Sequence, residues 1–89
     1  MRLRGSAHAK DDQDLAFTRA RRRHYQDELM DYYVSWRDAC RSVAEAYESW
    51  RSAQRQDEAL AFGAYASALD REEQAATAYQ GAVAQLAAA

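Results

Sequence analysis

The sequence predicts an all-α protein, an antiparallel hairpin of two long helices with coiled-coil-like packing. Apolar residues recur at spacings of three and four in two separate stretches, and the chain contains no proline. Residues at that spacing share one face of a helix, and two such faces bury each other when the helices pack. The first row, here called the first seam, comprises Leu29, Tyr33, Trp36, Cys40, Val43, Tyr47 and Trp50. The second seam comprises Phe62, Tyr65, Leu69, Glu72, Ala76, Tyr79, Val83 and Leu86.

The first helix is expected at about 12–53. Residues 1–11 have little apolar content and are expected to form a flexible N-terminal arm. Asp11, Asp12 and Asp14 place negative charge where a helix N-terminus favours it, so one of them is expected to cap the helix.

The beginning of this helix differs from the rest. Extending the first seam backwards over residues 12–25 gives mostly polar positions. This part is therefore expected either to project beyond the packed region or to turn away as a separate short helix.

A turn is expected at about 54–57, followed by the second helix at about 58–87 with Asp57 as its N-cap. If the first seam continued past Trp50, apolar residues would fall at positions 54, 57, 61 and 64. The second seam instead begins one residue late, at Phe62. A continuous coiled coil would have to change its winding locally to accommodate this one-residue shift, whereas a reversal of the chain needs no such change. The phase therefore favours a hairpin over a single rod.

Folding the chain back near residue 56 matches the two seams layer by layer. The large Trp36 then meets the small Ala76, as packing at native density requires. The expected layers are Trp50 with Phe62, Tyr47 with Tyr65, Val43 with Leu69, Cys40 with Glu72, Trp36 with Ala76, Tyr33 with Tyr79, and Leu29 with Val83.

Alanine occupies most positions on one flank of both seams. One interpretation is that alanine is simply the best helix former. The other is that this flank docks against a second helix pair, giving a homodimeric four-helix bundle that covers the exposed ring edges. The candidate dimer face comprises Tyr32, Ala39, Ala46, Ala61, Ala68, Ala75 and Ala82. On the opposite flank, Arg37 and Glu73 are placed to form an ion pair.

Length and cysteine content also favour self-association. A chain of 89 residues is one small domain, and domains of this size often need a staple or a partner. Cys40 is the only cysteine, so an internal disulfide is impossible, and no cysteine–histidine cluster has zinc-ligand spacing. Oligomerisation is the remaining common route to stability, so a homo-oligomer, namely a dimer, is expected.

Two polar seam residues each allow two interpretations. Glu72 is expected to accept a hydrogen bond from Trp36 or a tyrosine and so to fix the helix register. The alternative is a buried acid with a chemical role beside Cys40. That cysteine, with apolar neighbours, is expected to be a small core residue, and the alternative is a reactive thiol.

A basic segment at residues 19–24 is the one dense cluster of positive charge. Residues 1–24 carry seven basic and three acidic side chains, a net charge of +4, whereas residues 25–89 carry five and eleven, a net charge of −6. One interpretation is a solvated helix face whose charge is neutralised by Asp27, Glu28 and Asp31, and the next is a contact with an acidic protein partner. Binding of nucleic acid phosphates is a less favoured alternative, because no aromatic residues are interleaved and no recognition-helix pattern follows. The candidate contact residues are Arg19, Arg21, Arg22 and Arg23.

No motif for an enzyme or a cofactor is found in the sequence. There is no phosphate-binding glycine loop, HExxH or nucleophile elbow, and His8 and His24 lie outside any Glu-x-x-His motif. We therefore expect no catalytic, metal or cofactor-binding residues. The first residues show no signal peptide and no apolar run is long enough to span a membrane, so a cytoplasmic protein is expected. The heavy use of alanine and arginine, which have GC-rich codons, favours a bacterial source.

A helical hairpin of this length, with tryptophan close to the central turn at Trp50-Arg51-Ser52, resembles the small secreted WXG100 proteins of type VII secretion systems. That resemblance implies a secreted helical hairpin as a further alternative. The chain departs from the family pattern because the glycine of the motif is missing. Tyr79 is also followed four residues later by Val83, where the family has an acidic residue. The resemblance is one of shape.

Overall fold

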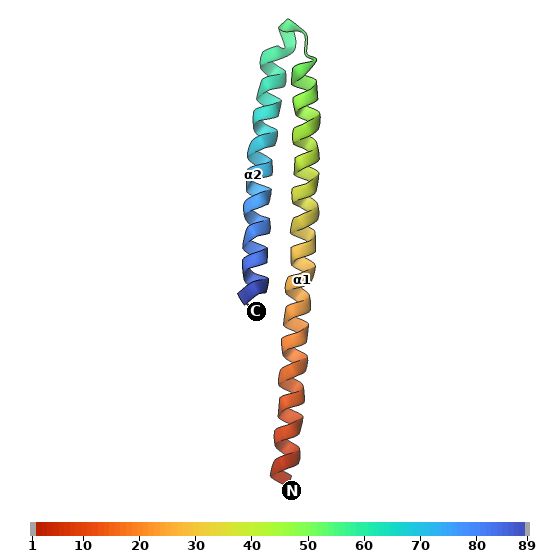
Figure 1. Cartoon of the computed structure of the whole chain (residues 1–89), viewed down its shortest axis with the longest axis vertical. Coiled ribbons are helices and arrows are strands. Elements are labelled where there is room, and N and C mark those ends of the chain that lie inside the picture. Colours follow the sequence, from red (N-terminus) through yellow and green to blue (C-terminus); the bar gives the residue numbers. More distant parts are fainter. Residues whose placement is uncertain (1, 89) are drawn as a thin grey trace.

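The computed structural model describes the backbone of residues 2–88 and the side chains of residues 12–88. Two long helices run antiparallel and are joined by a short loop, as Figure 1 shows. Helix α1 spans Arg2–Arg51, η1 is a single 3-10 turn at Arg55–Asp57, and α2 spans Glu58–Ala88. The predicted all-α hairpin is confirmed, and no strand occurs in the described part of the chain.

Helix α1 begins ten residues before the predicted start at residue 12. Its backbone is helical through Asp11, Asp12 and Asp14, so these residues do not mark a helix N-terminus and the predicted cap is wrong. The polar part over residues 12–25 continues α1 and is not a separate helix. A proline would have ended the helix, and none is present. The flexibility of residues 1–11 stays a prediction.

Polar residues form the C-terminal end of helix α1. The backbone N–H of Ser52 donates to the carbonyl oxygen of Glu48 at 3.1 Å, and the Ser52 hydroxyl donates to the same oxygen at 2.7 Å. Arg51 places a positive charge in the last turn, where the helix dipole favours it. Gln54 then takes an extended conformation, with φ −71° and ψ 158°, and the chain reverses.

The reversal uses no residue with positive φ among those described. Asp57, predicted as the N-cap of α2, instead lies in η1, and its N–H donates to the carbonyl oxygen of Gln54 at 2.8 Å. Glu58, at the end of η1, is already helical, so the 3-10 turn runs directly into α2. The loop thus starts at Ser52, two residues before the predicted turn.

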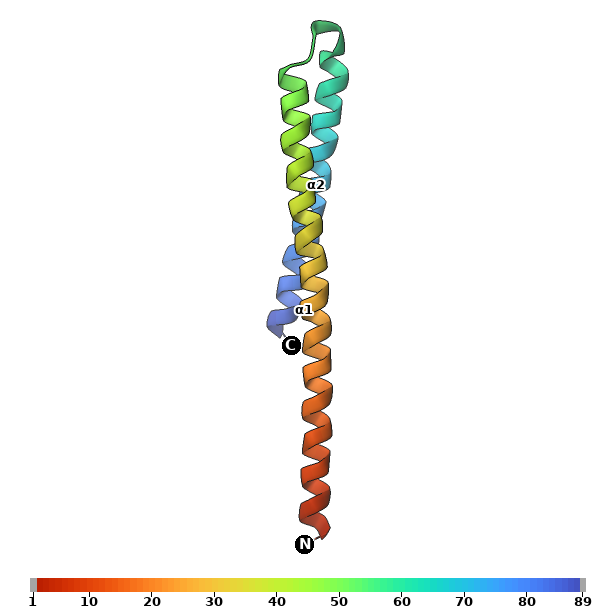
Figure 2. The ribbon, with the colours of Figure 1, turned by 90° about the vertical axis from the view of Figure 1, so that its right-hand side faces the viewer.

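The molecule is a rod, with principal extents of 83 × 14 × 13 Å. Its radius of gyration is 22.7 Å, whereas a compact domain of this length has one of about 12 Å. Figures 1 and 2 show that α1 extends well past the end of α2. Gln85 and Ala88 of α2 share a surface hollow with Arg21 and Tyr25 of α1, which locates the end of the packed region. The part of α1 before Arg21 therefore projects, as the sequence allowed.

The contact between the helices is rotated relative to the two predicted seams. On α2, Ala68 and Ala82 are 1% and 5% exposed and are the only buried hydrophobic residues among those described. Three residues of the second seam, Phe62, Leu69 and Val83, are exposed instead, and Ala76 is half-buried. The residues of α2 that face α1, all buried or half-buried, are Ala61, Tyr65, Ala68, Glu72, Ala75, Tyr79, Ala82 and Leu86.

This rotation corrects the predicted dimer face. The alanines of that face do not form an outer flank, because they lie buried or half-buried between the two helices of one hairpin. Of that set, Tyr32 alone is exposed. The alanines on α1, Ala39 and Ala46, are half-buried opposite the alanine row of α2.

The rotation follows from how closely the two helices can pack. Rows of alanine allow two helix backbones to approach closely, and the closest approach gives the most contacts per residue. The rings of Tyr65 and Tyr79 alternate with the alanines in the row of α2 that faces α1 and are half-buried. The rings of Tyr33, Tyr47 and Phe62 lie beside this row and keep part of their surface exposed.

Candidate functional site

An aromatic cluster lies beside the loop and joins the two helices. Trp50 of α1 stacks on Tyr65 of α2, with ring centroids 5.4 Å apart and an interplanar angle of 15°. Phe62 meets the Trp50 ring edge-on at 5.2 Å. Tyr47 lies 5.7 Å from Tyr65. The predicted layers that pair Trp50 with Phe62 and Tyr47 with Tyr65 are therefore present.

A second aromatic cluster lies further along the hairpin. Trp36 stacks on Tyr79 at 5.5 Å with an interplanar angle of 11°. Tyr33 lies 5.6 Å from Tyr79, as its predicted layer requires. Trp36 was expected opposite Ala76, and its stacking on Tyr79 reflects the rotation of the contact towards the alanine row.

A polar layer separates the two clusters. The indole N–H of Trp36 donates to Oε1 of Glu72 at 2.9 Å, which confirms the expected hydrogen bond. The Cys40 Sγ lies 4.0 Å from the same oxygen, so the predicted layer of Cys40 and Glu72 is also present. The cysteine is half-buried and free. The layer thus contains one hydrogen bond between the helices and a contact with the cysteine sulfur, and a chemical role for Glu72 or Cys40 stays an alternative.

The flank that was expected to hold an ion pair between Arg37 and Glu73 is arranged differently. The guanidinium carbon of Arg37 lies 6.0 Å from the centroid of the Trp36 ring. No ion pair joins Arg37 and Glu73 in the described part of the chain. The indole face is a good site for a cation, and this contact was not anticipated from the sequence.

The rotation leaves a row of apolar residues along one side of the hairpin. Each of its residues except Tyr33 follows a buried or half-buried alanine by one position, and in antiparallel helices that step turns both sets of side chains to the same side. Phe62, Leu69 and Val83 are 50%, 40% and 43% exposed, and Tyr33 and Tyr47 are 39% and 42% exposed. We call this surface the exposed stripe. It comprises the exposed residues Tyr33, Tyr47, Phe62, Leu69 and Val83 and the half-buried residues Cys40 and Ala76.

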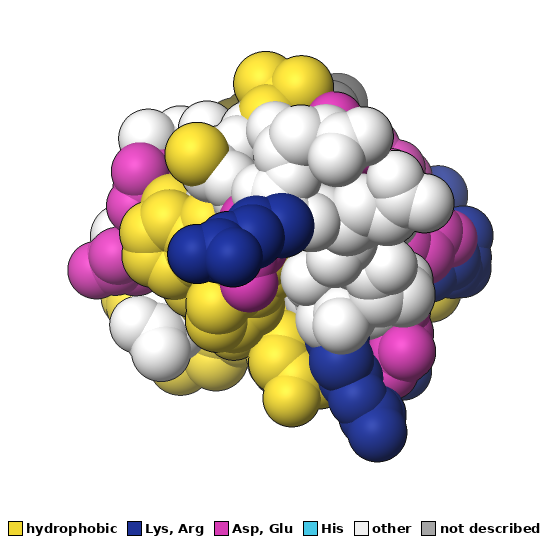
Figure 3. All heavy atoms as spheres, turned by 90° about the horizontal axis from the view of Figure 1, so that it is seen from above, with side chains coloured by type: hydrophobic (Ala, Val, Ile, Leu, Met, Phe, Trp, Pro, Cys, Tyr) yellow, Lys and Arg dark blue, Asp and Glu magenta, His cyan; other side chains and the backbone are white. Residues whose placement is uncertain are grey.

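The view along the rod shows hydrophobic side chains uncovered at the loop end (Figure 3). They lie at several points around the outline, interspersed with charged side chains of both signs. Large exposed apolar surfaces on small proteins commonly mark interaction sites. The exposed stripe is therefore the candidate functional site of this molecule.

The basic segment lies where α1 emerges from the hairpin. Its four arginines are exposed, and successive residues of a helix point about 100° apart, so the cations surround the helix and do not share one face. His24 lies 3.6 Å from Glu28, one turn further along. The predicted contact of this segment with an acidic protein or with nucleic acid stays a prediction.

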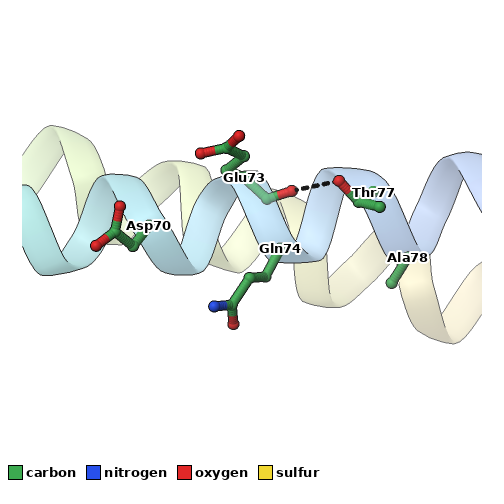
Figure 4. Close-up of a pocket in the computed structure, with 5 residues that line it drawn as sticks. All are labelled: Asp70, Glu73, Gln74, Thr77 and Ala78. Carbon is green, nitrogen blue, oxygen red and sulfur yellow. Dashed lines mark hydrogen bonds between the residues drawn. The ribbon is translucent and has the colours of Figure 1, made fainter.

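A hollow on the outer side of α2 is drawn in Figure 4. Its lining residues all come from this one helix, and the Thr77 hydroxyl donates to the Glu73 carbonyl oxygen at 3.0 Å. No second element closes the hollow, and its residues are all exposed. The lining residues are Asp70, Glu73, Gln74, Thr77 and Ala78. It is a depression between side chains of one helix, and it does not form a ligand cleft.

No group of three or more potential metal ligands occurs among the described residues. Within the same residues, neither helix contains a stretch of sufficient length and hydropathy to cross a bilayer.

Comparisons with models of protein families, with curated proteins and with solved structures found no match. The similarity to WXG100 hairpins thus rests on shape and on the tryptophan near the turn. In the structure Trp50 lies in the last turn of α1, beside the loop.

Sequence reasoning found the residues of the site but assigned two surfaces in reverse. The alanine row was taken as the outer face, and the residues of the exposed stripe were taken as the core. One signal could have revealed this: alanine recurs at 61, 68, 75 and 82, in phase with Tyr65, Glu72, Tyr79 and Leu86. These two sets together form a row with the same alternation of three and four as the predicted seam.

Proposed function

We propose that this chain is a non-enzymatic protein–protein interaction or assembly module, which works by packing its exposed stripe against other helices. In its simplest form the stripe packs against a second copy and yields a dimeric four-helix bundle. The observation that carries the proposal is the lack of any large, fully buried side chain among the described residues. Two helices alone leave Tyr33, Tyr47 and Phe62 of the aromatic clusters 39%, 42% and 50% exposed.

The total surface supports the same conclusion. The chain exposes 7446 Å², whereas a compact monomer of its mass exposes about 5,300 Å². A partner in an interface of standard size buries roughly 800 Å² of its own surface. The hairpin thus has ample uncovered area for a stable contact, and the exposed stripe contributes apolar side chains from both helices to it.

A charged substitution in the stripe tests the proposal. Leu69→Glu places a carboxylate at the centre of the surface that is to be buried, and we expect it to raise the dimer dissociation constant about 30-fold or more, equivalent to about 2 kcal/mol. Leu60→Glu is the matched control, because Leu60 is 80% exposed on the outer side of α2. We expect this control to leave the dissociation constant unchanged. Sedimentation equilibrium over a range of concentrations measures both.

Two results would contradict the proposal. One is an unmodified chain that sediments as a monomer at every concentration while it keeps its helicity and a high melting temperature. The other is an equal effect of both substitutions on association, which would place the contact outside the exposed stripe. Far-UV circular dichroism of each variant establishes that it remains helical.

A further inference from the structure

The exposed stripe is symmetrical about one layer of the hairpin. On α1 its members are spaced seven residues apart, with Cys40 midway between Tyr33 and Tyr47. On α2 its members are also spaced seven apart, and their midpoint falls between Glu72 and Glu73. The contact of 4.0 Å between Cys40 and Glu72 shows that the two midpoints lie in the same layer. A surface with this symmetry matches a copy of itself that has been turned end over end.

We propose that the exposed stripe binds the exposed stripe of a second copy with the two loops at opposite ends, and that the two-fold axis passes through the layer of Cys40 and Glu72. The inference rests on the proposed function and specifies its partner and geometry. Two-fold interfaces pair residue i with residue j and j with i. Here α1 lies antiparallel on α1 of the second copy, and α2 on α2.

The side chains in this arrangement are complementary in size. Leu69 lies opposite Ala76 of the second copy, and the larger Phe62 lies opposite Val83 of the second copy. Pairing of large with small residues fills an interface without voids or overlap. Tyr33 lies opposite Tyr47 of the second copy, where two rings can pack edge to face. Cys40 lies opposite its own counterpart beside the axis.

Charge distinguishes this arrangement from the one with both loops at the same end. With both loops at one end, the projecting parts of α1 would also lie at one end. The basic segments of the two copies, with the exposed Arg19, Arg21 and Arg22, would then lie at the same end of the assembly. Like charges repel each other, the more so at low ionic strength. With the loops at opposite ends, the two basic segments lie at opposite ends of the assembly.

The native cysteine provides the test. A short bismaleimide added to the unmodified chain at micromolar concentration is expected to give a covalent dimer through Cys40, separated on a denaturing gel. Thiols held together in a complex have an effective concentration in the millimolar range, so crosslinking should be on the order of 100-fold faster than by random collision. The control is Cys40→Ser combined with Ala78→Cys, which moves the thiol to an exposed position on the far side of α2.

Two further variants on the Cys40→Ser background define the direction of packing. Chains with Tyr33→Cys alone or Tyr47→Cys alone are expected to crosslink no faster than the control, because each thiol lies far from its counterpart. An equimolar mixture of these two chains is expected to give the crosslinked heterodimer. Rapid crosslinking of either variant with itself would overturn the arrangement.

Sedimentation of the unmodified chain in the same buffer separates two kinds of failure. If the chain is a monomer, the proposed function fails together with this inference. If the chain is a dimer but Cys40 crosslinks no faster than the control, only the arrangement is wrong. Because the first experiment uses the native sequence, the inference remains testable even if a tyrosine substitution impairs folding.

Discussion

At the scale of single residues, one carboxylate fixes the register of the hairpin. Glu72 lies in the inward-facing row of α2 and is half-buried. A carboxylate removed from water costs free energy unless it gains a hydrogen bond, and the indole N–H of Trp36 at 2.9 Å provides one. Sliding α2 by one helical turn would break this bond and leave the carboxylate against apolar side chains. Glu72 therefore favours a single alignment of the two helices.

A double-mutant cycle measures this contact. Trp36→Phe and Glu72→Ala are each expected to lower the free energy of unfolding, and their coupling is expected to be about 1 kcal/mol, the net value of a hydrogen bond. Urea unfolding at fixed protein concentration, followed by circular dichroism, provides the values. Trp50→Phe combined with Glu72→Ala is the control, and these effects should add to within about 0.4 kcal/mol. A coupling of only about 0.4 kcal/mol between Trp36→Phe and Glu72→Ala would show that the hydrogen bond does not determine the register.

At the scale of elements, the two helices meet through alanine. Ala68 is 1% exposed and Ala82 is 5% exposed, although both are small residues on a long, isolated helix pair. Each lies where the backbones come closest, with the aromatic clusters to the side. The packing of this hairpin thus depends as much on the small size of the alanine side chains as on the aromatic rings.

Enlarging a buried alanine should separate the helices. Ala68→Leu inserts three carbon atoms into the closest part of the contact and is expected to cost about 1–3 kcal/mol of unfolding free energy. Ala78→Leu makes the same change on the exposed outer side of α2. It should change stability by no more than about 0.5 kcal/mol. Thermal and urea unfolding compare the two, and equal effects would place the alanine row outside the contact, as the sequence first indicated.

At the scale of the whole molecule, the hairpin is stabilised by packing between its two helices, whereas the projecting part of α1 is not packed against α2. Between Trp36 and Trp50, α1 packs against α2 through both aromatic clusters. The projecting part has no such neighbour, and Leu15 and Phe17 are 54% and 68% exposed. Helices without tertiary packing are marginally stable in water. The rod should therefore be rigid at the loop end and fray towards its N-terminus.

Hydrogen–deuterium exchange resolved by mass spectrometry tests this difference. Amides of residues 12–20 are expected to exchange orders of magnitude faster than those of residues 36–50, since local opening costs less free energy where no contacts are lost. The comparison within one chain is its own control. Equal protection of the two segments would mean that a partner covers the projecting part in solution.

Much of the fold was predictable, because helix formation and chain reversal depend on local sequence. Spacings of three and four and the lack of proline predicted both helices, and the one-residue skip before Phe62 predicted the reversal. The start of α1 was not predictable from Asp11, Asp12 and Asp14. Acidic residues favour a helix N-terminus but are also tolerated inside a helix, so their presence does not require the helix to begin there.

The sequence by itself determined that two apolar faces exist and that they lie antiparallel. It also determined the residues that belong both to the predicted seams and to the observed contact, such as Trp50, Tyr65 and Tyr79. Only the tertiary structure decided which neighbouring row completes the contact, alanine or the larger residues of the exposed stripe. Both rows have the same period, so periodicity cannot separate them. The choice depends on how closely two backbones can approach, which is a property of the packed pair and not of either helix alone.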